Sequence, residues 1–227
     1  MQPRVARWFL VFSAVLLSGP VGLVTAQPCK AQSVSPEAVQ FVYELNRARH
    51  APASWAEEMG LASRIGGDGQ SATLLDVLAK PPLAISEILA EAAFFHSNDM
   101  GKNNFLAHAS DTTGLLPNER VREAGYLLPY QINLEDGVYN LPDAENSVES
   151  LAAGYGAEEF DFEDPVNVLM ALIVDTGVES LGHRKHLLGV GAFLGASREV
   201  GVGYASYASS DFQNYWTIHT GFTADLY

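Results

Sequence analysis

Two carboxylates and two imidazoles occupy one short stretch of the sequence. Asp175 and Glu179 follow an apolar run, residues 166–174, and His183 and His186 come a few positions later. If the two histidines lie on one helix, they share a face, with about 5–6 Å between their Cβ atoms. Acids and histidines at the polar end of a buried element are typical of metal sites and acid–base sites. A helix end with solvated charges fits the stretch equally well.

Two further histidines lie earlier in the chain. His96 continues the apolar face of a helix expected over residues 85–100, which indicates a histidine of the core rather than a ligand. His108 lies in a polar turn, where the local sequence alone gives no reason for a function. Local sequence therefore leaves His108 unassigned.

The elements that would position these residues change in type along the chain. Apolar residues recur every three to four positions in the first two thirds, which predicts helices. Alternation of apolar with small or polar residues near the C-terminus predicts two antiparallel strands. Helices first and strands last predict an α+β fold. The expected helices cover residues 35–51, 55–61, 85–100, 116–126, 148–153 and 165–174, and the expected strands cover residues 130–134, 200–205 and 215–222.

The N-terminal segment, residues 1–26, has the features of a secretory signal peptide. Arg4 and Arg7 precede an apolar stretch of about 17 residues, shorter than the roughly 20 that a membrane span needs. A retained membrane anchor is the competing interpretation. We expect a signal peptide at 1–26, a leader at 27–34 and one domain at 35–227. The mature protein is then secreted, in a periplasmic or extracellular location, and not membrane-embedded.

The chain is strongly acidic. Its net charge of −14 becomes −16 without residues 1–26, because that segment contains two arginines and no acid. Such a surface repels phosphate groups, so we expect no nucleic-acid partner and no adhesion to anionic lipid. Cys29 is the only cysteine of the sequence, so we expect no internal disulfide, and a chain of this length can bury a core without one.

Four segments, in this order, resemble the CAP superfamily (SCP/TAPS domains of cysteine-rich secretory proteins, antigens and pathogenesis-related proteins) in its disulfide-free bacterial type. The segments are Glu44-Leu45-Asn46-Arg47-Ala48-Arg49, Asn104-Phe105-Leu106-Ala107-His108, Glu145-Asn146 with Ala152-Ala153-Gly154-Tyr155, and Gly182-His183-Arg184 with Tyr215-Trp216-Thr217. The resemblance implies a three-layer α–β–α sandwich with a central antiparallel sheet. It also implies a cleft in which two histidines and two acids hold a divalent cation in some members.

The resemblance assigns residues to that cleft. His108 and His183 match the two histidines, which makes them the candidate metal ligands, and Glu145 matches the acid of a Glu-Asn motif. Asp175 matches the second acid by spacing, and Glu179 is the alternative.

His186 stands where the family tends to have asparagine. It is either a third imidazole near the cleft or a residue that faces solvent, and we favour solvent. The cation would be zinc or calcium.

Three functions follow. The first is a secreted CAP/SCP protein that binds a divalent cation and a small apolar ligand such as a sterol or lipid, without evident catalysis. The sequence contains neither a His-Glu-x-x-His helix nor a Gly-x-Ser-x-Gly turn, so no catalytic motif stands out. The second is a metal-dependent hydrolase that uses the same cleft, with His186 as an extra ligand or base. The third is an interaction module with a vestigial site.

Overall fold

The computed structural model describes residues 34–61, 77–156, 159–178 and 180–222. The expected signal peptide and Glu179 lie outside the described residues. Within the described part of the chain, no helix has both the length and the apolar character that a membrane crossing requires.

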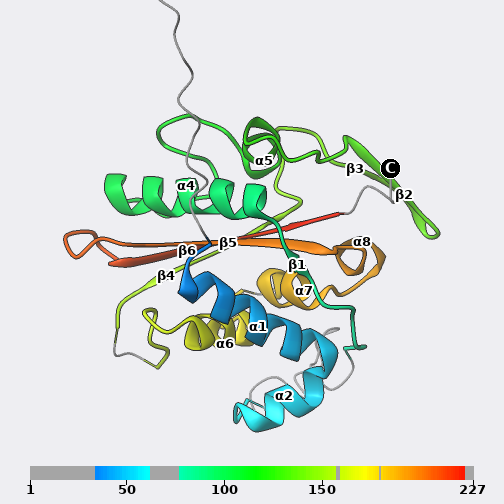
Figure 1. Cartoon of the computed structure of the whole chain (residues 1–227), viewed down its shortest axis with the longest axis horizontal. Helices are drawn as coiled ribbons and strands as arrows, with labels where there is room; N and C mark the ends of the chain where they lie inside the picture. Colours follow the sequence, from blue (N-terminus) through cyan, green and yellow to red (C-terminus); the bar gives the residue numbers. More distant parts are fainter. Residues whose placement is uncertain (1–33, 62–76, 157–158, 179, 223–227) are drawn as a thin grey trace, which may run out of the picture. The chain divides into compact units, whose positions relative to one another are not determined.

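A four-stranded sheet lies at the centre of the described residues (Figure 1). Its order is β1 (Ala84–Ile85), β5 (Glu199–Ser206), β6 (Asn214–Gly221) and β4 (Glu149–Gly154). The neighbours β5, β6 and β4 are antiparallel, and the two-residue strand β1 pairs with β5 in parallel. The expected central antiparallel sheet is confirmed, with one short parallel strand at its edge.

Helices cover both faces of this sheet. Figure 1 shows α4 (Glu87–Asn103) on one face and α1 (Pro36–His50), α6 (Pro165–Val174) and α7 (Gly182–Leu188) on the other. Each face of the sheet buries its own apolar cluster beneath those helices. The α+β fold in three layers, helix–sheet–helix, is therefore confirmed.

Two helices, α1 and α6, begin at the caps that the sequence predicts. The Ser35 hydroxyl accepts a hydrogen bond from the Ala38 amide at the start of α1, and Asp164 caps α6 through the Val166 amide. A proline follows each cap at the first helical position, where its missing N–H costs nothing. The remaining helices are α2 (Pro52–Glu58), α5 (Pro117–Glu123) and α8 (Ala192–Gly195).

Two glycines of β5 let α4 lie directly on the sheet. A Cβ at Gly201 would stand 2.1 Å from the backbone nitrogen of Ala90. One at Gly203 would stand 2.2 Å from the carbonyl carbon of Ala93. No side chain fits in that space, so the alternating glycines fix the distance between the helix and the sheet.

Several sequence expectations differ from the structure. The short helix expected over residues 55–61 is α2 (Pro52–Glu58), three residues earlier. The segment expected as a helix over residues 148–153 is strand β4. Five of its six residues are buried, and a short run that is buried on both faces has no periodicity to tell a strand from a helix. The short strand near residue 130 is β2 (Gln131–Leu134), and its partner β3 (Gly137–Asn140) completes a hairpin that the sequence pattern did not predict.

Candidate functional site

A cavity of about 440 Å³ lies between the loop that carries His108 and the start of α7. Strand β4, at the edge of the sheet, contributes Glu149 and Ser150 to its wall. The complete lining is His108, Asn146, Ser147, Glu149, Ser150, Val178, Ser180, Gly182, His183, His186 and Leu194. Three histidines from two distant segments thus share one cavity.

The first histidine is paired with an acid of β4. His108 Nδ1 lies 2.8 Å from Glu149 Oε1. The carboxylate side chain is fully buried, whereas 42% of the His108 side chain is exposed. Because an ionised carboxylate only accepts hydrogen bonds, Nδ1 carries a proton, and in the neutral form of the ring the lone pair is on Nε2.

Glu149 also accepts hydrogen bonds from two buried cationic or basic side chains. Arg120 Nη2 and His219 Nε2 both donate to its Oε2, the latter at 2.8 Å. Burial by itself would raise the pKa of Glu149. The hydrogen bonds from His108 and His219 and the positive charges of His219 and Arg120 outweigh burial and hold that pKa below its usual range. The carboxylate is therefore ionised at neutral pH.

The loop that carries His108 is fixed by two further interactions. The Arg120 guanidinium donates to the His108 carbonyl at 3.1 and 3.2 Å. At the base of the loop, buried Asp99 accepts hydrogen bonds from the Ser110 hydroxyl at 2.6 Å and from Asn103 at 2.7 Å. These contacts make the position of His108 well defined even though it lies in a loop.

The second pair is local in sequence. His183 Nδ1 lies 2.7 Å from Asp175 Oδ1, and Asp175 Oδ2 accepts from the backbone amides of His183 at 3.0 Å and Arg184 at 3.3 Å. Asp175 ends α6 in the left-handed conformation, with φ 55°. The Asp175 side chain is 1% exposed, and the His183 side chain is 28% exposed. Asp175, which the spacing assigned as the second acid, thus lies beside His183 but does not line the cavity.

The structure does not bring Glu145 into the cavity. Glu145 is exposed, and its backbone carbonyl accepts a hydrogen bond from Asn118. Glu149, four positions on, takes the place that the motif assigned to Glu145. The motif assigned Glu145 by resemblance alone; in the structure, Glu149 begins strand β4 and its side chain meets His108.

His186 was expected to face solvent, and that expectation is wrong. It is 6% exposed, and its Nδ1 and Nε2 each lie 2.7 Å from a hydroxyl oxygen, of Ser150 and Thr220 respectively. Burial, followed by the nearby charges of His183 and His219, lowers the pKa of His186 to about 3. The ring is neutral and both of its nitrogens are engaged, because α7 packs this face against β4 and β6.

Sequence reasoning missed His219. This residue is fully buried on β6, directly opposite Glu149 in the β4–β6 register. The alternating pattern of the strand placed it in a sheet, but no local signal indicates which residue of another strand it faces. His96, expected in the core, is fully buried, and its Nε2 lies 4.0 Å from Glu149 Oε1. Burial lowers the pKa of His96 to about 4.

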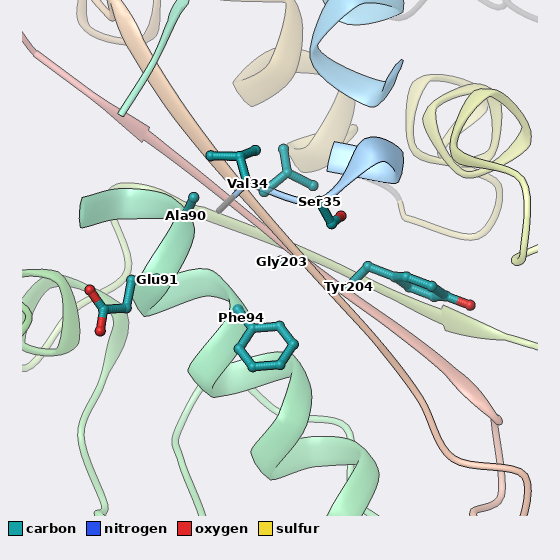
Figure 2. A pocket seen from close by; sticks show the side chains of 8 residues that line it. Val34, Ser35, Ala90, Glu91, Phe94, Gly203 and Tyr204 are labelled. Atoms are coloured by element: carbon teal, nitrogen blue, oxygen red, sulfur yellow. The ribbon is translucent and has the colours of Figure 1, made fainter. Parts of the chain in front are cut away.

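A separate cavity of about 50 Å³ lies between the start of α1, helix α4 and strand β5 (Figure 2). Figure 2 shows Glu91 and Phe94 on α4 and Tyr204 on β5 around it. This volume holds no more than a few water molecules, so it is no ligand site.

Of the comparisons with known proteins, only the one with solved structures gives matches. No protein-family model matches the chain, and no curated protein matches it. One similar solved structure is an extracellular protein with an SCP domain from Bacillus anthracis. Its TM-score is 0.45 and its identity 17%, over 85% of this chain and 45% of that chain.

Two further solved structures are similar. An outer surface protein from Borrelia burgdorferi gives a TM-score of 0.43 and 14% identity, over 81% of this chain and 92% of that chain. A cysteine-rich secretory protein from Staphylococcus aureus gives 0.31 and 14%, over 82% of this chain and 39% of that chain. The chain thus spans less than half the length of the Bacillus and Staphylococcus proteins.

Proposed function

We propose that the chain is an exported CAP/SCP-type protein whose cavity binds a divalent cation between His108 and His183. One observation carries the proposal: each imidazole gives its Nδ1–H to a buried carboxylate, Glu149 or Asp175. This arrangement leaves the lone pair on Nε2 and is typical of metal-binding histidines, whose partner acid fixes the tautomer and orients the ring.

The donor set favours zinc over calcium. Zinc binds imidazole nitrogen readily, whereas calcium takes six to eight oxygen ligands. Both carboxylates are already occupied by hydrogen bonds, and in the described residues no group of three or more His, Cys, Asp or Glu side chains is arranged to hold a metal ion. Two protein ligands leave positions for water or a bound molecule, which suits reversible binding.

A small apolar ligand could lie beside the cation. A second cavity of about 300 Å³ shares Val178 and His183 with the first. Its apolar lining includes Leu106, Leu151, Phe160, Phe162 and Leu172. A molecule with a polar end at the imidazoles and an apolar body, such as a lipid or sterol, matches this division, and the volumes are in the range of small-molecule sites.

The proposal includes no catalytic step. The hydrolase alternative depends on His186 as a ligand or base, and both nitrogens of His186 are hydrogen-bonded to hydroxyls. Its lowered pKa makes the protonated ring costly, so His186 is a poor base for the neighbouring Ser150.

Zinc titration of the purified protein, followed by calorimetry and metal analysis, tests the cation. We expect wild type to bind zinc at neutral pH, and His108→Ala and His183→Ala each to lose it. His50→Ala is the matched control, because His50 is an exposed histidine at the end of α1. Absence of zinc binding by wild type, or equal binding by all three variants, would contradict the proposal. Native mass spectrometry of the same sample would report a co-purified lipid.

A further inference from the structure

One edge of strand β4 pairs with β6, and the other edge faces the two cavities. The Thr220 amide donates to the Val148 carbonyl at 2.8 Å. This bond determines which residues of β4 direct their backbone groups toward β6. In an antiparallel pair, the backbone groups of successive residues point alternately toward the partner strand and away from it. The N–H and C=O groups of Glu149, Leu151 and Ala153 therefore point away from β6.

Both ends of this outer edge are already paired. Asn146 Oδ1 accepts from the Glu149 amide at 2.9 Å, and Asn146 Nδ2 donates to the Glu149 carbonyl at 3.1 Å. These are the two hydrogen bonds that a residue of a neighbouring strand would make. Beyond the other end of the strand, the Tyr155 carbonyl accepts from the Phe162 amide at 3.1 Å.

Leu151 and Ala153 lie between these paired ends. Within the part of the chain that the structure describes, their outward N–H and C=O groups have no hydrogen-bond partner outside the sheet. Both residues line the apolar cavity of about 300 Å³, which meets the imidazole cavity at His183 and Val178. Two donors and two acceptors thus stand in a row at the wall of a binding cavity, which is the pattern of a strand edge ready to pair.

We propose that this edge binds an extended peptide segment as an added strand of the sheet. The peptide backbone hydrogen-bonds to Leu151 and Ala153, and one of its apolar side chains fills the apolar cavity. Its chain continues past His183 toward His108. This inference goes beyond the proposed function: it shares the cavity, but it rests on the strand edge and does not require the cation.

The backbone groups of the edge fit a peptide better than a lipid or sterol, and the two kinds of ligand would compete for the same apolar cavity. A lipid or sterol in the apolar cavity would cover Leu151 and Ala153 and leave their polar groups without partners, at a cost in free energy. An extended peptide satisfies all four groups, and its alternating side chains reach separate pockets. The chain's net charge of −14 favours a neutral or basic segment over an acidic one.

Amide hydrogen exchange of the full chain, measured by NMR, tests the edge directly. In the free protein we expect the amides of Leu151 and Ala153 to exchange rapidly and those of Ser150 and Ala152, which point to β6, to exchange slowly. Protection of Leu151 and Ala153 equal to that of Ala152 would overturn the inference, because the edge would then already be paired.

A phage-displayed library of random heptapeptides, panned on the full chain, supplies the ligand probe. The most enriched sequence is synthesised, and its affinity is compared between wild type and Ala153→Pro. Proline removes the outward N–H and is tolerated on a strand edge. We expect binding to weaken about tenfold or more, the effect of losing one hydrogen bond and the close approach of the backbones. Ala153→Val, which retains the N–H, is the matched control and should bind.

Backbone N-methylation of the same peptide keeps the test decisive if Ala153→Pro does not fold. Methylation at alternate positions should abolish binding, and methylation at the positions between them should not. Lack of enrichment on wild type, or equal tolerance at every position, would overturn the inference. Zinc uptake by wild type is measured in parallel, so zinc binding without peptide binding refutes this inference and not the proposed function.

Discussion

The two histidine–acid pairs of the cavity are alike in chemistry and different in origin. In the pair His183–Asp175, the partners are eight residues apart, and Asp175 also accepts two backbone amides from the first turn of α7. In the pair His108–Glu149, the partners are 41 residues apart, and the acid is held by two more side chains, Arg120 and His219.

This difference indicates which interactions stabilise the buried acid of each pair. Asp175 accepts hydrogen bonds from two backbone amides at the start of α7. If its side chain changes, a small rearrangement gives those amides another acceptor. Glu149 balances buried positive charge, and a buried charge that loses its partner is costly. Loss of the acid in the pair His108–Glu149 is therefore expected to lower the free energy of unfolding more than loss of the acid in the pair His183–Asp175.

The largest effect is expected from Glu149→Gln. This change leaves Arg120 and His219 buried against a neutral amide, so the free energy of unfolding should fall by about 3–5 kcal/mol. Urea unfolding measures it. Glu145→Gln, at an exposed acid in the preceding loop, is the control and should stay within about 0.5 kcal/mol of wild type. Equal costs for the two variants would remove the distinction between the pairs.

The pH dependence of stability is expected next. Each pair has a buried neutral histidine beside it, His96 near Glu149 and His186 near His183, with pKa values lowered to about 4 and about 3. Between pH 6.5 and 4.5 the unfolded chain binds a proton on each ring and the folded chain does not. Stability should therefore fall with falling pH by about 1.4 kcal/mol per unit for each histidine. Urea unfolding at several pH values measures this dependence. In His96→Gln and in His186→Gln, the free energy of unfolding should change less steeply with pH, by the amount that one proton contributes. An unchanged pH dependence in both variants would contradict this.

A smaller effect is expected from Asp175→Asn. Asparagine tolerates the left-handed backbone and still accepts hydrogen bonds, but it loses the negative charge, so the cost should be about 1–2 kcal/mol. The nitrogen chemical shifts of the His183 ring give a second measurement, because the tautomer with the proton on Nδ1 should lose population. A cost as large as that of Glu149→Gln would show that both pairs balance buried charge.

The smallest effect is expected from Asn146→Ala. The variant loses the two hydrogen bonds to the Glu149 backbone at an exposed position, so the cost should be about 0.5–1 kcal/mol. Hydrogen exchange at the Glu149 amide should become faster while His183 is unaffected. If the amide remains equally protected, the side chain of Asn146 does not act as a strand partner.

The sequence by itself determined the features that depend on neighbouring residues. Ser35 and Asp164 begin their helices, and Asp175 ends the buried helix where its side chain can meet the next element. The motif resemblance selected His108 and His183, and the alternation of residues near the C-terminus predicted β5 and β6. Helix caps and hydrophobic periodicity depend on residues a few positions apart, so they can be recognised in the sequence without knowledge of the fold.

Only the tertiary structure decided that Glu149 is the partner of His108 and that His186 and His219 are buried. Glu149 replaces Glu145 because the segment 149–154 joins the sheet, and the β4–β6 register then sets His219 opposite it. His186 is buried because its helix packs against those same strands. Strand register and helix packing are fixed by contacts between segments far apart in the chain, and no pattern within one segment encodes which partner it will meet.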